Sequence, residues 1–264
     1  MSFPSLERHG INATEADIVG WTKSANREII SSHGSATQVI KMGKIVVKFG
    51  NIYEEESRNQ QHAFQILSPD IFQVPEVYHF FEAGDTSYLV MEFVAGESLE
   101  QITVDNAKDI ARRVDRMHQC VNTLLGPFRE GGICRGRLWP EGQERCFDGK
   151  HELEGFVNSR IVHSSLYFAL SEGAFSLCHM DLAPRNIRKT AAGYCLLDWE
   201  YAGSYPRTFE MAVLRCNHGY ENQDGLFCDL VEKHLSEMRP LSHAEEEQID
   251  CMVLVAFNNI CYSL

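Results

Sequence analysis

The segment from Cys178 to Glu200, CHMDLAPRNIRKTAAGYCLLDWE, concentrates side chains that bind cations and move protons. His179, Asp181 and Asn186 lie close together, and Asp198 follows after a short apolar run. Carboxylate and amide oxygens are the ligands that magnesium prefers, and a positioned aspartate can accept the proton of a hydroxyl group. The spacing therefore indicates a site for a hard cation beside a general base.

A β-hairpin is expected to bring the two halves of this segment together. Residues Ile187 to Leu197 alternate like two strands and turn near Ala192-Gly193. Such a hairpin returns the chain to its starting point, so Asp198 is expected to meet Asn186 at one metal cluster.

The first hundred residues read mainly as strands. The stretch EIISSHGSATQVIKMGKIVVKFG predicts strands separated by turns at Gly34 and Gly43, and EVYHFFEAGDTSYLVMEFV predicts a hairpin that turns at Ala83-Gly84-Asp85. Between them, IYEEESRNQQHAFQIL has helical periodicity. Its expected shared face consists of Glu56, Gln60, Ala63, Phe64 and Leu67.

Helical patterns dominate after Gly96. The segment DNAKDIARRVDRMHQCV predicts a helix, and a Ser242-x-x-Glu245 capping box predicts the start of another. The apolar face of the first helix is expected to contain Ile110, Val114, Met117 and Val121. Residues 126–150 are rich in glycine and charge and read as a long irregular insertion. The expected fold class is α+β, a bilobal protein-kinase-like fold with a β-rich N-lobe containing one helix and a mainly helical C-lobe. We place the nucleotide-binding lobe at residues 1–95 and the catalytic and acceptor-binding lobe at 96–264.

The order of the motifs matches a known catalytic pattern. Protein kinases place an Asp after a His, an Asn five residues after that Asp, and a metal-binding Asp after a hairpin. The motifs HMDLAPRNI and LLDWEYAG, preceded by VVKFG and YLVMEFVAGESL, resemble the aminoglycoside phosphotransferase and choline kinase-like family, in particular its fungal-type small-molecule kinase-like subgroup. The resemblance extends from about Ile29 to Ala212.

This resemblance implies an ATP- and magnesium-dependent enzyme that transfers the γ-phosphate to a hydroxyl of a small molecule. It makes Asp181 the catalytic base, Asn186 and Asp198 the magnesium ligands, and Lys48 the strand lysine at the α- and β-phosphates. It places Met91, Glu92 and Phe93 on the strand beside adenine, where backbone groups are the expected hydrogen-bonding partners.

Several nucleotide contacts have alternatives. Glu56 is favoured as the partner of Lys48, but it belongs to a run of three glutamates, and relatives carry a glutamate nearer to the position of Gln60. Gly34 and Ser35 are expected to contact phosphate through their backbone N–H groups, and a plain hairpin turn explains them equally well.

Other residues near the catalytic loop have structural explanations. His179 is expected to hold the loop backbone by hydrogen bonding. Glu200 either braces the chain after Asp198 or reaches a second metal or the acceptor.

Composition limits the classes of partner. The formal net charge of −13 argues against nucleic acid and anionic membranes, and no run of residues is apolar enough to suggest a membrane span or signal peptide. Nine cysteines without a Cys-x-x-Cys pair indicate buried free thiols in a reducing, cytoplasmic compartment. The oligomeric state is not determined by these features.

The acceptor is expected to be a small molecule. Only WEYAGSYPRT separates Asp198 from the helix near Phe209, which is too short for a phosphorylatable activation segment. We expect an acceptor pocket between the 126–150 insertion and the C-terminal helices. Acidic residues there either attract an amine-bearing acceptor or simply form solvated helix faces. They are Glu221, Asp224, Asp229 and Glu232.

Two alternatives to a small-molecule kinase remain. One is a catalytically silent nucleotide-binding pseudokinase, which the intact Asp181, Asn186 and Asp198 disfavour. The other is a kinase-like pocket reused for non-phosphorylating biosynthetic chemistry.

Overall fold

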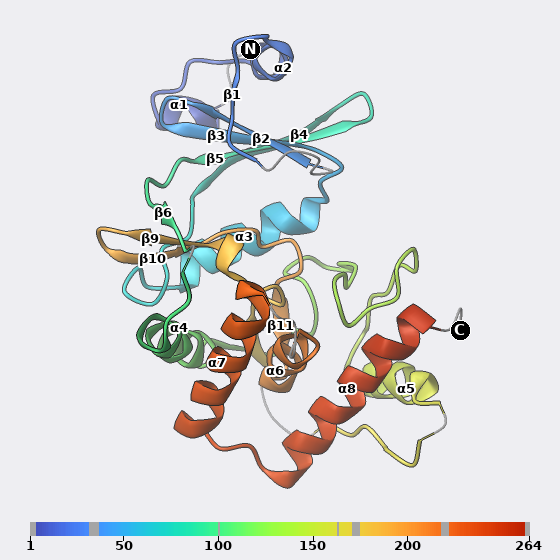
Figure 1. Cartoon of the computed structure of the whole chain (residues 1–264). Helices are drawn as coiled ribbons and strands as arrows, with labels where there is room; N and C mark the ends of the chain where they lie inside the picture. The colour runs from blue at the N-terminus through green and yellow to red at the C-terminus, as the bar shows by residue number, and fades with distance from the viewer. Residues whose placement is uncertain are drawn as a thin grey trace.

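A computed structural model describes residues 4–31, 37–99, 101–162, 164–170, 175–217 and 222–261. The chain folds into an N-terminal antiparallel sheet and a helical C-terminal part (Figure 1). In the first part the elements are α1 (Pro4–Arg8), α2 (Glu15–Lys23), β1 (Glu28–Ile29), β2 (Thr37–Met42), β3 (Ile45–Gly50), α3 (Glu54–Ile66), β4 (Val77–Ala83) and β5 (Thr86–Glu92). They are followed by β6 (Glu97–Ser98), α4 (Val104–Met117), β7 (Val121–Asn122), α5 (Lys150–Arg160), β8 (Phe175–Cys178), the 3₁₀ turn η1 (Pro184–Asn186), β9 (Ile187–Thr190), β10 (Gly193–Leu196), β11 (Gly203–Tyr205), α6 (Arg207–Arg215), α7 (Gln223–Met238) and α8 (His243–Cys261).

The N-terminal sheet has five strands in the order β1-β2-β3-β5-β4, all antiparallel. Gly43 and Gly84 have φ values of 62°, which fits tight turns between β2 and β3 and between β4 and β5. Both hairpin predictions are therefore confirmed, whereas the turn expected at Gly34 lies outside the described residues. Helices α1 and α2 cover one face of the sheet, where Ile18 packs in a cluster with Ile40 and Val47.

Helix α3 follows β3 in the chain and lies between the sheet and the helical part (Figure 1). Ala63 on α3 joins the largest hydrophobic cluster, which extends through α4, α6, α7 and α8. In that part, α4 packs on α7 and α6 packs on α8. The observed architecture confirms the predicted α+β, protein-kinase-like fold class.

Two short sheets support the catalytic segment. The hairpin β9–β10 pairs Ile187 with Leu196 and adds β6 at its other edge, which confirms the hairpin predicted before Asp198. β8 pairs with β7 and β11. The predicted capping box is present as well, because the Glu245 amide donates to the Ser242 hydroxyl and Glu245 accepts from the Ser242 amide.

One part of the predicted α4 face is wrong. Ile110, Val114 and Met117 are buried as expected, but Val121 lies beyond the end of the helix in β7 and is 65% exposed. The helical periodicity of the sequence continues to Val121, but this residue pairs with β8 instead. The strand contact overrides the local pattern. Residues 126–149 contain no helix or strand, as expected for an irregular insertion.

Within the described part of the chain, no helix combines the length and the apolar character that crossing a lipid bilayer requires.

Candidate active site

Lys48 is the buried centre of an ion-pair cluster. It lies on β3 and is only 7% exposed. Its Nζ donates to both carboxylate oxygens of Glu56, at 2.8 and 2.9 Å, and to Asp198 Oδ1 at 3.1 Å. Burial alone would lower the pKa of Lys48, but the charges of Glu56 and Asp198 outweigh burial and raise it. The structure thus brings together three residues that are 8 and 150 positions apart.

The first turn of α3 contains three glutamates with three different surroundings. Glu56 is 1% exposed and faces Lys48, whereas Glu54 pairs with Arg58 and Arg129. Glu55 is also buried and accepts from the Ile133 amide. The Gln60 side chain donates to the Pro75 carbonyl at 2.8 Å instead of pairing with Lys48. Of the alternatives that the sequence left open, the geometry places Glu56 against the lysine.

The predicted face of α3 is wrong at Phe64, which is 42% exposed. Asn59, which is polar, is fully buried instead. Its Nδ2 donates to the Trp199 carbonyl at 3.1 Å and its Oδ1 accepts from the Phe128 amide at 2.9 Å. Hydrophobic periodicity missed this residue because the helix packs against backbone groups of two loops, which select a hydrogen-bonding side chain.

Asp198 projects from a backbone with φ of 64°, a left-handed conformation that is uncommon for residues other than glycine. The carboxylate oxygens of Asp198, Glu200 and Glu56 lie within 4.8 Å of one another. Burial raises the pKa of Glu200, Lys48 opposes this effect, and Asp198 adds to it. Three carboxylates facing one lysine leave excess negative charge, which a divalent cation would neutralise.

The loop that carries Asp181 is held in place by His179. Its Nε2 contacts the Leu197 carbonyl at 3.0 Å, and its Nδ1 accepts from the Asp181 amide at 3.3 Å. These two partners fit the tautomer that carries its proton on Nε2. His179 therefore links the loop to the residue immediately before Asp198, as the sequence predicted.

Asp181 is held by its own loop. Asn186 donates to the Asp181 carbonyl at 2.9 Å and to Oδ2 at 2.8 Å. Arg185 donates to Oδ1 at 2.6 Å and to Oδ2 at 2.8 Å, and it also reaches Asp224 on α7 at 3.4 Å. Because the Asn186 nitrogen faces Asp181, the amide oxygen is the atom left for a cation. Sequence reasoning did not single out Arg185.

A second functional residue that sequence reasoning missed is Glu210 on α6. Its carboxylate is fully buried and accepts from the backbone amides of His179, at 2.6 Å, and Met180, at 3.0 Å. Met180 has a φ of 65°, so this brace supports an uncommon backbone conformation. The signal available in the sequence was a single glutamate inside the apolar run TFEMAVL, because a carboxylate is buried only where hydrogen bonds compensate it.

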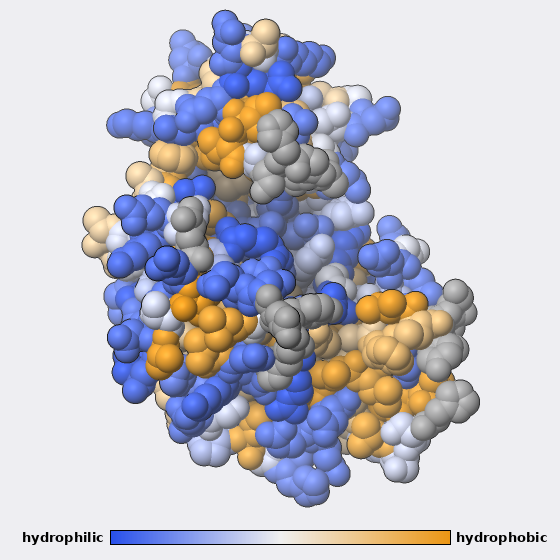
Figure 2. All heavy atoms as spheres, viewed as in Figure 1, coloured by the Kyte–Doolittle hydropathy of each residue, from blue (hydrophilic) through white to orange (hydrophobic). Residues whose placement is uncertain are grey.

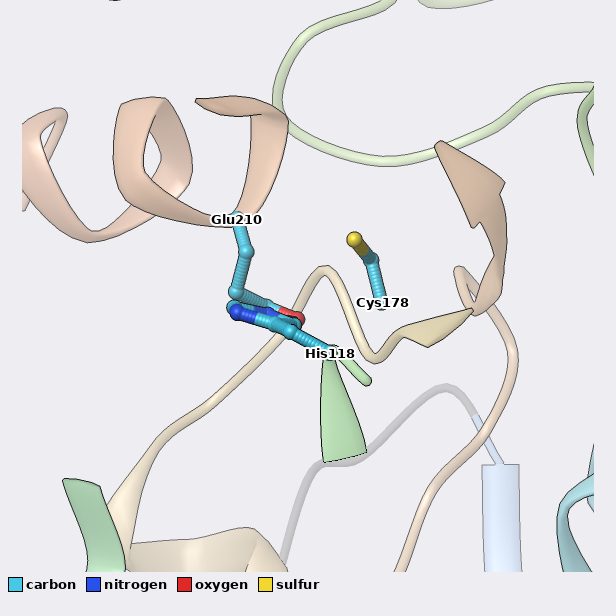
Figure 3. Close-up of side chains that lie close together, drawn as sticks. All are labelled: His118, Cys178 and Glu210. Carbon is cyan, nitrogen blue, oxygen red and sulfur yellow. Dashed lines mark ion pairs between the residues drawn. The ribbon is translucent and has the colours of Figure 1, made fainter. Parts of the chain in front are cut away.

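Figure 3 shows the side chains of Glu210 and His118 meeting, with Cys178 on the adjoining strand. His118 Nε2 lies 3.9 Å from Glu210 Oε2, and ligand atoms of all three residues are within 4.8 Å of one another. Burial raises the pKa of the Cys178 thiol, and the Glu210 oxygens already accept two amides. This group therefore serves as a brace for the catalytic loop rather than as a set of metal ligands.

The residues expected beside adenine lie at the end of β5 and directly after it. Met91 is buried and its sulfur lies 3.5 Å from Gln60 Nε2, while the Glu92 amide donates to the Glu76 carbonyl at 2.9 Å. The Phe93 amide donates to the Lys44 carbonyl at 2.9 Å, so this N–H is already committed within the protein. Gly34 and Ser35 lie outside the described residues.

A cavity of about 970 Å³ opens beside Asp181. Its walls come from the 126–150 insertion, the loop at Asp181, the start of α7 and the end of α8. An acceptor pocket was predicted between the insertion and the C-terminal helices, without the loop. On the face shown in Figure 2, hydrophilic side chains predominate between the sheet-bearing and helical parts, and hydrophobic side chains gather over the helical part. Residues that line the cavity include Tyr53, Arg135, Arg137, Trp139, Gln143, Asp181, Arg185, Glu200, Tyr201, Asp224 and Asn259.

Only part of the predicted acidic cluster borders this cavity. Asp224 lines it, but Glu232 pairs with Arg215 at 2.7 Å and Asp229 does not line it. Glu221 lies outside the described residues. Of the three acidic residues that the structure describes, Asp224 alone lines the cavity.

The sequence profile of the phosphotransferase enzyme family matches residues 32–241. No match was found among curated proteins. Among solved structures, aminoglycoside phosphotransferase APH(4)-Ia has 12% sequence identity and a TM-score of 0.60 over 96% of this chain and 88% of that chain. The structure of the streptomycin-ATP-APH(2")-IIa ternary complex has 13% identity and a TM-score of 0.54 over 90% and 86% of the two chains.

A putative fructosamine-3-kinase from Haemophilus somnus 129PT has 13% identity and a TM-score of 0.58 over 98% of this chain and 88% of that chain. At such identities these likenesses show a common fold.

Proposed function

The chain belongs to the phosphotransferase enzyme family, and on that premise we propose that it transfers the γ-phosphate of ATP, held by magnesium, to a hydroxyl group of a small molecule. The observation that carries this proposal is the ion-pair cluster in which the buried residues Lys48 and Glu56 meet the partly exposed Asp198. A charged cluster of this kind costs desolvation free energy, so its retention beside an open cavity favours a ligand-binding role. The solved relative APH(2")-IIa is in a complex with ATP and streptomycin.

Nucleotide binding is assigned to the lobe formed by residues 1–95. Lys48 is already oriented by Glu56, and its Nζ provides the positive charge for the α- and β-phosphates. Met91, Glu92 and Phe93 form the edge of the adenine site, with the Phe93 amide excluded as a donor because Lys44 accepts from it. Gly34 and Ser35 remain the proposed backbone contacts to phosphate.

Magnesium fits the donor set at the junction of the two lobes. Asn186 and Asp198 offer an amide oxygen and a carboxylate oxygen, and Glu200 adds a carboxylate nearby. Oxygen ligands of this kind suit a hard cation, which when bound neutralises charge on the β- and γ-phosphates. Asn186 has a second task, since its nitrogen orients Asp181.

Asp181 is proposed to accept the proton of the acceptor hydroxyl. A carboxylate offers about four acceptor positions, and Arg185 and Asn186 fill three of them. The remaining position is open to a hydroxyl in the adjoining cavity, whose wall Asp181 forms. Residues 96–264 therefore carry both the catalytic loop and the acceptor site in this proposal.

A small-molecule acceptor is favoured by the shape of the segment after Asp198. The chain enters β11 at Gly203 and α6 at Arg207, which leaves no extended segment to bind a peptide. The adjoining cavity of about 970 Å³ is at the upper end of the usual range for small-molecule sites.

The test is transfer of label from γ-³²P-ATP, with magnesium, to a panel of hydroxylated amines, sugars and alkaloid-like compounds. We expect at least one compound to be labelled, and we expect Asp181→Asn to slow the transfer about 10²- to 10⁴-fold while nucleotide affinity is kept. Equal rates for the wild type and Asp181→Asn on a labelled compound would refute the role of Asp181. Nucleotide binding without labelling of any compound would favour the pseudokinase alternative.

A further inference from the structure

A second cavity, of about 590 Å³, lies between the end of the 126–150 insertion and α5. It shares no lining residue with the cavity beside Asp181. Its walls consist of Arg145, Cys146, Phe147, His151, Glu152, Gly155, Phe156, Ser159 and Arg160. None of these residues has a task in the proposed phosphoryl transfer.

Arg160 is the unusual member of this wall because it is a buried cation without a counter-charge. The residue is 4% exposed, and its Nη2 donates to the neutral side chain of Gln143 at 2.8 Å. Among the described residues, no carboxylate lies within ion-pair distance of Arg160. Buried guanidinium groups are normally paired, since an uncompensated charge is costly to remove from water.

Arg145 places a second guanidinium beside the first. Its Nη2 donates to the same Gln143 oxygen at 3.0 Å, and within the described chain it too has no carboxylate partner. Both guanidinium groups lie near the ring of Phe156, at 5.3 Å for Arg145 and 5.5 Å for Arg160. Burial, and secondarily the charge of Arg145, lowers the pKa of Arg160. Two like charges therefore converge on one neutral acceptor.

The other charged groups at the cavity do not neutralise this pair. Glu152 lines the wall, but its Oε2 accepts from the Asp148 amide at 2.8 Å and it forms no ion pair with either arginine. His151 adds a further potential donor. The cavity thus combines free N–H groups and excess positive charge with enough room for a ligand.

We propose that this second cavity is a binding site for a small oxyanion, a phosphate group or a carboxylate, held between Arg145 and Arg160. Planar guanidinium groups bind both kinds of oxyanion through paired N–H donors. Both groups already lie beside the Phe156 ring, so part of their side-chain freedom is restricted before binding.

Isothermal titration calorimetry of the full chain tests the site, with inorganic phosphate and acetate as separate probes at an ionic strength held constant with sodium chloride. We expect saturable binding of at least one probe, weakened roughly tenfold to a hundredfold in Arg145→Met and Arg160→Met, because each substitution removes charge-assisted hydrogen bonds. Tighter binding of phosphate assigns the site to phosphate groups, and tighter binding of acetate assigns it to carboxylates.

The matched control is Arg112→Met, which alters an exposed arginine on α4 far along the chain from this cavity and is expected to bind as the wild type does. Arg145 is exposed, so Arg145→Met remains informative even where Arg160→Met does not fold. Phosphate should also raise the melting temperature of the wild type more than that of Arg145→Met. Unchanged binding in Arg145→Met, or no saturable binding of either probe to the wild type, would overturn the proposal.

Discussion

At the scale of single residues, the candidate site depends on which polar groups are buried together. Lys48 is charged in a place with little water because two carboxylates contact it. The pair with Glu56 holds the Nζ in position without a ligand, which in the proposed function reduces the reorganisation needed when phosphate binds. Removing one member leaves the other as a buried, poorly compensated charge.

Glu56→Gln is expected to lower the free energy of unfolding by about 3 kcal/mol, because Lys48 keeps only Asp198 as a charged partner. Urea unfolding of the purified variant measures this change. The matched control is Glu54→Gln on the same turn of α3, where the side chain is a third exposed and we expect a loss below about 0.5 kcal/mol. Equal losses for the two variants would show that the buried pair contributes no more than a surface pair.

Among the elements of the fold, α6 positions the loop that carries Asp181, although the two are about 30 residues apart in the chain. Glu210 of α6 accepts from two successive amides of the loop, and His118 at the end of α4 lies beside the same carboxylate. Three elements therefore meet at one buried group (Figure 3). The loop geometry is consequently a property of how α4, β8 and α6 pack together.

Glu210→Ala is expected to cost about 3 kcal/mol of unfolding free energy, since it leaves the two buried amides of His179 and Met180 without their acceptor. Hydrogen exchange of the His179 and Met180 amides should become faster, relative to global unfolding. Glu237→Ala on α7, whose side chain is 54% exposed, provides the control. If exchange at the two loop amides kept its wild-type protection in Glu210→Ala, the brace would have no role in fixing the loop.

Glu245, in the first turn of α8, is a titratable residue that accepts hydrogen bonds from Arg207 and Ser242. Burial raises the pKa of Glu245, but hydrogen bonds from Arg207 and Ser242 outweigh burial and lower it below the usual value of 4.5. A carboxyl with a lower pKa in the folded state stabilises the fold above its unfolded pKa, and this contribution is lost as the pH falls through the folded pKa.

We therefore expect Glu245→Gln to lose about 1 kcal/mol relative to the wild type at pH 7 and to approach it below about pH 4. Thermal unfolding across this pH range measures the difference. A gap between the two proteins that stayed constant down to acidic pH would mean that the Glu245 charge does not support α8.

At the scale of the whole molecule, the sequence predicted the elements with local signals and missed contacts made across the chain. Gly43 and Gly84 marked hairpins because a tight turn needs their positive φ, and the spacing from His179 to Asp198 predicted the catalytic segment. Glu210 was missed because the single glutamate in the apolar run TFEMAVL indicates a buried carboxylate but not its partners, which depend on α6 lying beside the loop.

The walls of the cavities were missed for a related reason. Residues 126–149 have no periodicity, so the sequence predicted that this insertion would border a pocket but not which side chains would face it. The exposed Phe64 and the buried Asn59 show the same limit on α3, where loop backbone groups rather than apolar surface cover the helix. Glu56 was the favoured partner of Lys48 in the sequence, a register nearer to Gln60 was left open, and the fold distinguishes the two.

Thermal unfolding with and without ATP and magnesium, for the wild type and Asp198→Asn, tests the proposed nucleotide site most directly. At about 100 times the dissociation constant, the ligand should stabilise the wild type by about 2.7 kcal/mol, which corresponds to a rise in melting temperature of roughly 5–10 °C. We expect this rise to require magnesium and to disappear in Asp198→Asn. No rise in the wild type, or an equal rise in the variant, would contradict it.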